Sequence, residues 1–180
     1  MANLVVLRPL GLGDFLTAVP AYRALADAFP DHRLLLAAPA ALAPLFRLVP
    51  VTSGGARLVD TAPLRPLPPP LVGADLAVDL HGKGPQSHRV LLDSGPRRLI
   101  AFSHGAVPES AGGPTWRPDE HEVHRWCRLL EESGVVADPG RLDLVPPGPP
   151  PGLAGATVVH PGAASAARVS ARSTTSQSTS

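Results

Sequence analysis

The sequence predicts an α/β fold built on a parallel β-sheet, and three observations lead to this prediction. Short, nearly continuous apolar runs alternate along the chain with segments of helical periodicity, as in proteins with buried parallel strands. The first run ends at a Gly11-Leu12-Gly13 turn and a helix-like segment follows, which is how a βαβ unit opens. The 180 residues are 44% hydrophobic and 17% charged, which is typical of a globular domain.

The predicted strands are apolar runs bounded by proline, glycine or polar residues. Strands are expected at 3–8, 33–38, 56–60, 75–80, 97–102 and 156–160, and helices at 15–28, 40–48, 85–93 and 119–133. Pro20 falls inside the first helix, where it lacks the backbone N–H that a helix needs, so we expect a kink or a restart there.

The helix at 119–133 has the clearest pattern. Its apolar residues recur at i, i+3, i+4 and i+7 and form one apolar stripe. These residues are Val123, Trp126, Cys127 and Leu130. Asp119 is predicted to cap the start of this helix, and Gly134 is predicted to end it.

Two proline-rich segments, 61–71 and 144–153, are predicted to run extended, and chains commonly divide into domains at such places. We therefore expect an N-terminal domain at 1–143 and a linker at 144–155. The first strand and turn of a second α/β domain are expected at 156–168, followed by a disordered Ser/Thr tail at 169–180.

Charge and cysteine content exclude several classes of protein. A formal net charge of +1 gives no bulk attraction to nucleic acid, so no nucleic-acid partner is expected. The single cysteine, Cys127, rules out an internal disulfide and favours a reducing, cytoplasmic compartment. The first 13 residues lack the features of a signal peptide. The most apolar stretch, 34–46, is too short to span a bilayer.

Gly11-Leu12-Gly13-Asp14 is the most informative motif. Leu16 occupies the third glycine position of a dinucleotide fingerprint, and no G-K-[ST] follows, so the motif is neither that fingerprint nor a P-loop. Ligands of parallel α/β sheets bind outside the carboxyl ends of the strands, which makes Asp14 a candidate general base. The glycines would let the backbone turn and leave room for a ligand. The alternative is that Asp14 only caps the helix.

Two further turns carry candidate ligand-binding residues. The loop His81-Gly82-Lys83-Gly84 follows the strand at 75–80, carries the sole lysine and leads into Gln86 and Ser87. It is suited to an anionic or polyhydroxylated ligand, or is a solvated turn. The turn from His160 to Ser165 is rich in small residues, whose backbone N–H groups can face an anion, and Arg168 lies just beyond it.

A metal site is not expected. His121 and His124 are three residues apart, whereas a zinc-binding H-E-x-x-H helix places its histidines four apart.

Taken together, four ordered segments resemble glycosyltransferase family 9, which includes the ADP-heptose:lipopolysaccharide heptosyltransferases. The resemblance lies in Val6–Asp14 with the Pro20-Ala21 and Arg23–Leu25 that follow, in Asp79–His88, in Asp119–Val123 and in His160–Ala163. It implies a GT-B fold of two facing Rossmann-like domains, of which this chain would contain the N-terminal, acceptor-binding half.

The resemblance also implies roles for individual residues. Asp14 matches the family's catalytic aspartate, which deprotonates the acceptor hydroxyl during inverting transfer from a nucleotide-sugar. Acceptor or ligand binding is expected at Gly11, Gly13, His81, Gly82, Lys83, Gly84, Gln86 and Ser87. Binding of the donor phosphates is expected at His160, Gly162, Ala163 and Arg168. No metal and no cofactor is expected, because the ADP-sugar-like donor is itself a substrate.

The family's second domain would continue far beyond Arg168, but here Val169-Ser170 replace the expected basic residue, Trp and Pro. We therefore expect a truncated chain with little or no transferase activity when isolated, because donor binding supplies positioning and charge stabilisation. The expected partners are a nucleotide-sugar and a saccharide or lipopolysaccharide-type acceptor, with a peripheral contact to the inner membrane surface allowed. The alternatives are a non-catalytic acceptor-binding fragment and a Rossmann-type NAD-dependent oxidoreductase.

Overall fold

The computed structural model describes residues 2–51, 55–148 and 157. Met1–Pro146 form one compact unit. Of the second unit, Pro147–Ser180, only residues 147, 148 and 157 are described, and they lie in no helix or strand. The strand predicted at 156–160 and the predicted tail therefore fall outside the described residues, apart from Thr157.

The compact unit is built on one parallel sheet, as predicted. Its strands are β1 (Ala2–Leu7), β2 (His32–Ala38), β3 (Arg57–Asp60), β4 (Leu76–Asp79) and β5 (Leu99–Ile100). They lie in the order β3-β2-β1-β4-β5, and all four pairings are parallel. In the register, Leu4 of β1 is paired with Leu34 on one side and Leu76 on the other. The predicted α/β parallel fold is confirmed.

The helices follow the predicted segments with shorter bounds. They are α1 (Leu12–Thr17), α2 (Val19–Ala28), α3 (Ala43–Phe46), α4 (Gln86–Asp93) and α5 (Glu122–Glu131), with 3₁₀ turns η1 (Ala40–Leu42), η2 (Pro69–Leu71) and η3 (Pro108–Ser110). The helix predicted at 15–28 divides at Ala18, and Pro20 is the second residue of α2. The restart expected at Pro20 is confirmed, because the first helical turn needs no N–H from that residue.

The start of α5 differs from the prediction. The capping residue is His121, whose Nδ1 accepts a hydrogen bond from the backbone N–H of Val123 at 3.3 Å. Asp119 lies two residues too early to reach that N–H group, so its predicted capping role is wrong. Gly134 has φ +88°, a left-handed conformation that ends the helical segment as predicted.

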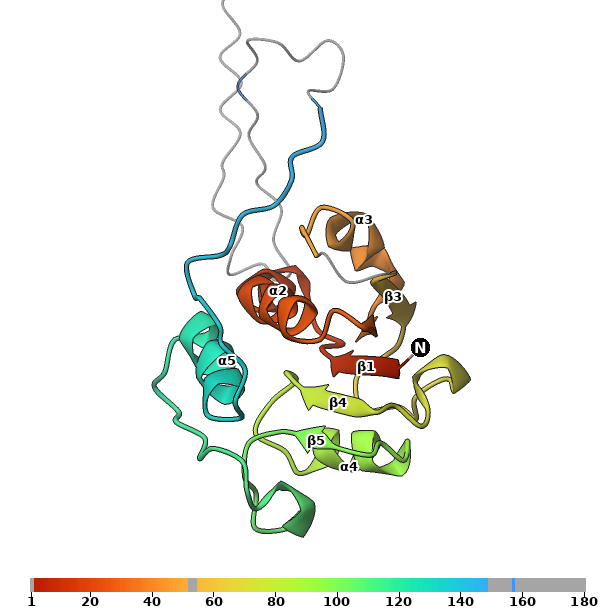
Figure 1. The fold of residues 1–180 in the computed structure, drawn as a ribbon, viewed down its shortest axis with the longest axis vertical. Coiled ribbons are helices and arrows are strands. Elements are labelled where there is room, and N and C mark those ends of the chain that lie inside the picture. Colours follow the sequence, from red (N-terminus) through yellow and green to blue (C-terminus); the bar gives the residue numbers. More distant parts are fainter. Residues whose placement is uncertain (1, 52–54, 149–156, 158–180) are drawn as a thin grey trace, which may run out of the picture. The chain divides into compact units, whose positions relative to one another are not determined.

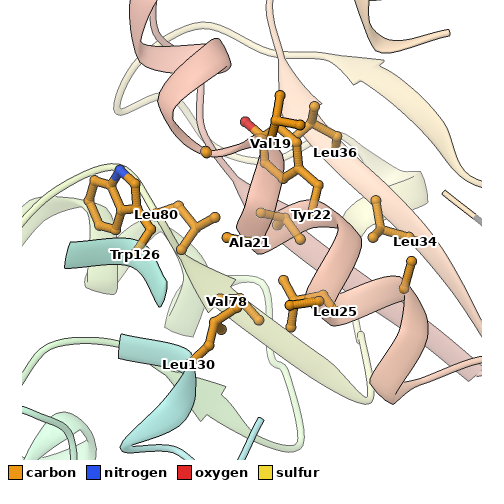
Figure 2. Packing of buried hydrophobic residues seen from close by; sticks show 14 of the residues in the cluster. Val19, Ala21, Tyr22, Leu25, Leu34, Leu36, Val78, Leu80, Trp126 and Leu130 are labelled. Atoms are coloured by element: carbon orange, nitrogen blue, oxygen red, sulfur yellow. The ribbon is translucent and has the colours of Figure 1, made fainter. Parts of the chain in front are cut away.

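Alternation along the strands divides the core into two layers. Leu4 and Val6 of β1 face the layer formed with α1, α2, α3 and α5, whereas Val5 and Leu7 face the layer formed with α4 and the segment before β4. Figure 1 shows α2 and α4 on either side of the sheet. In the larger layer, helical residues pack against residues of the sheet (Figure 2). Tyr22, Leu25, Trp126 and Leu130 come from α2 and α5, and Leu34, Leu36, Val78 and Leu80 come from β2, β4 and the position just after β4.

The strand order places a topological switch point between β1 and β4. The chain leaves β1 toward β2 and β3 and later returns to the other side of β1 with β4 and β5. The loops that follow β1 and β4 therefore meet at the carboxyl edge of the sheet, where ligands of open α/β sheets bind. Both carry residues that the sequence singles out.

The compact unit runs slightly beyond the predicted domain boundary. Leu144 packs against the larger core layer, and the N–H of Val145 donates to the carbonyl of Leu48 at 2.7 Å. Among the described residues, none of the helices has the length and apolar character needed to cross a bilayer.

Candidate active site

Asp14 lies at the carboxyl edge of the sheet, one turn into α1. Gly11 is the capping residue of this helix, so Asp14 occupies its third position rather than the cap itself. Oδ2 of Asp14 accepts a hydrogen bond from the N–H of Gly11 at 3.2 Å. This reach back to the cap is one half of a capping box, because glycine has no side chain to make the reciprocal hydrogen bond. The carboxylate nevertheless stays 42% exposed, so capping leaves it accessible to a ligand.

Arg8 is fully buried immediately behind Asp14 and is the main electrostatic feature of the site. It follows β1, and its Nε donates to the carbonyl oxygen of Asp14 at 2.9 Å. Nη1 donates to the carbonyl of Leu80, and the guanidinium lies 4.6 Å from the centre of the Trp126 ring. Nη2 is 3.7 Å from Oδ1 of Asp14. Arg8 thus fixes the backbone that carries Asp14 and supplies a nearby positive charge.

Glu122, the first residue of α5, completes the set of charges around Arg8. Its Oε2 accepts hydrogen bonds from Nη2 of Arg8 at 3.1 Å and from the hydroxyl of Thr17 at 2.9 Å. The carbonyl oxygen of Asp14 also lies 2.9 Å from the Thr17 hydroxyl, whose single proton is shared between these two acceptors. Residues far apart in the sequence therefore hold α1 in one position. The carboxylates of Asp14 and Glu122, both partly exposed, lie beside the buried guanidinium of Arg8.

The loop after β4 forms the other side of the site. His81 begins this loop, and the charges of Arg8 and Asp14 both act on its ring, which lies close to them. Burial, the main cause, and the positive charge of Arg8 lower the pKa of His81, which favours the neutral imidazole near neutral pH. Lys83 is exposed at the tip of the loop. The structure therefore brings together two motifs that the sequence separates by nearly seventy residues.

Other predicted site residues differ in how they could serve a ligand. Gly11 and Gly13 both lie on the exposed surface, but neither has a positive φ, so the turn does not require glycine as expected from the sequence. A Cβ at Gly13 would meet open space. Gln86 is exposed at the start of α4.

Ser87 differs from the other residues of the loop in being turned inward, and its contact with a ligand stays a prediction. It is buried, and its hydroxyl donates to the carboxyl group of Asp79. It therefore supports the loop from within. His160, Gly162, Ala163 and Arg168 lie outside the described residues, and the donor-phosphate role stays a prediction.

Two of the hollows beside the sheet lie at its opposite edges. One of about 520 Å³ opens at the carboxyl ends of β2 and β3, on the edge that carries Asp14. It is lined by Pro39, Asp60, Thr61, Ala62, Pro63, Arg65, Pro66 and Pro68. Another of about 680 Å³ lies between α3 and the amino end of β3, away from that edge. Within the described part of the chain, no three His, Cys, Asp or Glu side chains are grouped to hold a metal ion.

The sheet order and the loops at its switch point define a Rossmann-like α/β domain. The structure is similar to a glycosyl transferase family 9 protein from Veillonella parvula, with a TM-score of 0.56 and 16% identity over 76% of this chain and 42% of that one. It is also similar to the E. coli heptosyltransferase WaaC with ADP, with a TM-score of 0.51 and 12% identity over 73% of this chain and 47% of that one.

These likenesses confirm the Rossmann-like α/β arrangement that the resemblance to glycosyltransferase family 9 implies for the N-terminal half, and the second domain of the GT-B fold stays a prediction. The chain spans less than half the length of each of these two solved structures. No family model and no curated protein sequence matches the chain.

Arg8 and Glu122 are the site residues that sequence reasoning missed. The predicted strand at 3–8 already contained the clue for Arg8, because a charged residue that continues an apolar, buried run requires partners. Glu122 lies in the Asp119–Val123 segment of the resemblance, but its role was not identified, since its partners come from residues more than a hundred positions earlier in the chain.

Proposed function

We propose that this chain provides the acceptor side of a glycosyltransferase that transfers a sugar, with inversion, from a nucleotide-sugar to a saccharide. The observation that carries the proposal is the half-exposed Asp14 carboxylate, fixed by Gly11 and Arg8 at the switch point of a sheet with glycosyltransferase likeness. The two glycosyltransferase structures support the class of reaction. The ADP bound in one of them suggests an ADP-sugar as donor.

In the proposed reaction, Asp14 acts as general base. Its carboxylate takes the proton of an acceptor hydroxyl as that oxygen forms a bond to the anomeric carbon. The bond between the anomeric carbon and the diphosphate oxygen breaks at the same time, and the diphosphate leaves with the electron pair. A positioned base of this kind contributes on the order of 10²–10⁴-fold to the rate.

The remaining groups have supporting roles in the proposal. Arg8 and Thr17 hold the backbone carbonyl of Asp14, so the carboxylate needs little reorganisation when the acceptor arrives. The neutral His81 and the exposed Lys83 offer polar contacts to hydroxyl or anionic groups of the acceptor. The hollow beside Asp60 and Arg65 can take further sugar units along the same edge. The donor is used as a substrate, without a resident cofactor.

Ligand-dependent unfolding tests the proposal, because acceptor binding requires only this side of the site. We expect a saccharide acceptor to raise the melting temperature of the purified chain. A ligand at 100 times its Kd stabilises a protein by about 2.7 kcal/mol, which a thermal scan detects. Asp14→Ala should remove most of this protection. Asp31→Ala, which changes an exposed acid at the amino edge of the sheet, should leave it intact.

The outcomes separate the proposed function from its alternatives. Protection by NAD in place of saccharide would identify an oxidoreductase, although β2 ends at a buried Ala38 without the acidic residue that binds ribose in such proteins. Saccharide protection that persists in Asp14→Ala would indicate a binding module that does not use this carboxylate as a base.

A further inference from the structure

A second group of buried polar side chains lies beneath the loop that joins β4 to α4. Asp79, the last residue of β4, and His88, on the first turn of α4, are both fully buried. Nε2 of His88 lies 3.5 Å from Oδ2 of Asp79. Burying a carboxylate is costly unless it is paired or hydrogen-bonded, so this acid needs compensating contacts.

The hydrogen bonds to Asp79 all come from the loop and from the helix that follows it. Oδ1 accepts the backbone N–H of His81 at 2.8 Å. The N–H of Gly82 and the hydroxyl of Ser87 also donate to the carboxyl group. One buried side chain therefore binds the start of the loop and the first turn of α4 together.

His88 closes the same loop at its other end. Gly84 has φ +77°, and a Cβ at this position would collide with the His88 ring. The loop backbone thus lies directly on the imidazole. The His88 ring also approaches the ring of His104, with centroids 6.4 Å apart.

We propose that Asp79 is a positioning residue that holds the loop His81–Gly84 from below through hydrogen bonds, and that these bonds weaken when its buried carboxyl group takes up a proton. Asp79 does not need to touch a ligand for this role. The effect on acceptor binding rests on the proposed function, whereas the hold on the loop is a property of the fold itself.

The direction of the proton dependence follows from burial. Burial raises the pKa of Asp79 to about 6, although Ser87, the N–H groups of His81 and Gly82, and the charge of Arg8 act against this rise. Burial, together with His104, lowers the pKa of His88 to about 4. At pH 7 the ionised carboxylate accepts the N–H groups of the loop. Below pH 6 it becomes a neutral acid, and hydrogen bonds to a neutral acceptor are about half as strong.

Amide hydrogen exchange of the free chain, followed by NMR, tests the proposal without any ligand. We expect the protection factors of the His81 and Gly82 amides to fall about fivefold between pH 7 and pH 5, while those of β1 stay unchanged. In Asp79→Asn the carboxamide oxygen still accepts these N–H groups but cannot ionise, so protection should be retained without the pH response. In Asp79→Ala protection should be lost at both pH values.

His81→Gln is the matched control, because His81 lies in the same loop and also titrates. The pH response should survive in His81→Gln and vanish in Asp79→Asn, and the reverse result would overturn the proposal. This comparison decides the matter even where Asp79→Ala does not fold. If a saccharide did not raise the melting temperature, the proposed function would be refuted, but the hydrogen-exchange result for the loop would still hold.

Discussion

Arg8 shows how one side chain can organise a site that it does not need to expose. It contacts a carbonyl of α1, a carbonyl at the end of β4, the Thr17 hydroxyl and the Glu122 carboxylate. A planar guanidinium has five donors in a fixed arrangement, and a lysine ammonium cannot reach the same set of acceptors. The position of Asp14 therefore depends on a residue that is wholly inside the protein.

Replacing Arg8 with lysine keeps the charge and loses part of this network. A buried acceptor left without a partner costs about 1–3 kcal/mol, so we expect Arg8→Lys to lower the free energy of unfolding by about 2 kcal/mol. Arg97→Lys is the control, because the Arg97 side chain is 82% exposed and its exchange should change stability by less than about 0.5 kcal/mol. Urea unfolding of both variants measures the difference, and equal effects would contradict the role given to Arg8.

Two glycines of the loop after β4, Gly82 and Gly84, allow a second test of how single residues affect stability. Gly84 has a positive φ and no room for a Cβ beside His88, whereas Gly82 has neither restriction. A left-handed conformation costs a residue with a side chain about 1–2 kcal/mol, and overpacking adds about 1–3 kcal/mol. We expect Gly84→Ala to destabilise the fold by about 2–4 kcal/mol and Gly82→Ala to be close to neutral. Thermal unfolding of the pair checks this, and a neutral Gly84→Ala would show that the loop does not rest on His88.

Among the elements, α5 links the hydrophobic core to the site. Its buried stripe includes Trp126 and Leu130, while Glu122 at its first position binds Arg8. Figure 2 shows Trp126 and Leu130 facing side chains of the sheet and α2. Packing of this stripe therefore places Glu122 beside Arg8.

Leu130 allows the packing of α5 to be tested separately from its charges. It is fully buried, and replacing a buried leucine with alanine lowers the free energy of unfolding by about 2–5 kcal/mol because a cavity remains. We expect Leu130→Ala to lie in that range. His124→Ala, on the exposed face of the same helix, should stay within about 0.5 kcal/mol of the original chain. Chemical denaturation of both variants provides the comparison, and a small effect of Leu130→Ala would mean that α5 is not anchored by its stripe.

The elements were largely predictable because local patterns determine them. Apolar runs mark β1, β2 and β4, and the i, i+3, i+4, i+7 stripe marks α5, since burial on one face is recorded in the sequence itself. The cap of α5 was not predictable in the same way. His121 provides it through a ring nitrogen, whereas capping preferences favour the aspartate two residues earlier.

At the scale of the whole molecule, strand order decides which motifs meet. Asp14 and the loop at 81–84 were both identified in the sequence, and the return of β4 beside β1 brings them to one edge. The buried polar residues that hold each motif in place could not be predicted. Glu122 lies far along the chain from Arg8, and the burial of Asp79 and His88 depends on how α4 packs below the sheet. Sequence patterns show which residues face inward, but not which inward polar groups become partners.

The buried Asp79–His88 pair predicts that the stability of the fold changes with pH in opposite directions when one or the other residue is replaced. The raised pKa of Asp79, about 6 against 3.8, means that the folded chain holds a proton that the unfolded chain has lost, so this residue's contribution falls as pH rises from about 4 to 6. The lowered pKa of His88, about 4 against 6.5, has the opposite sign, and its contribution rises over nearly the same interval. In the original chain the two slopes offset each other. Relative to that chain, Asp79→Asn should therefore gain stability with rising pH and His88→Gln should lose it, as measured by urea unfolding at pH 4.5 and 6.5. Parallel slopes in both variants would show that the two groups do not titrate as a buried pair, because only opposite proton uptake on unfolding gives the divergence.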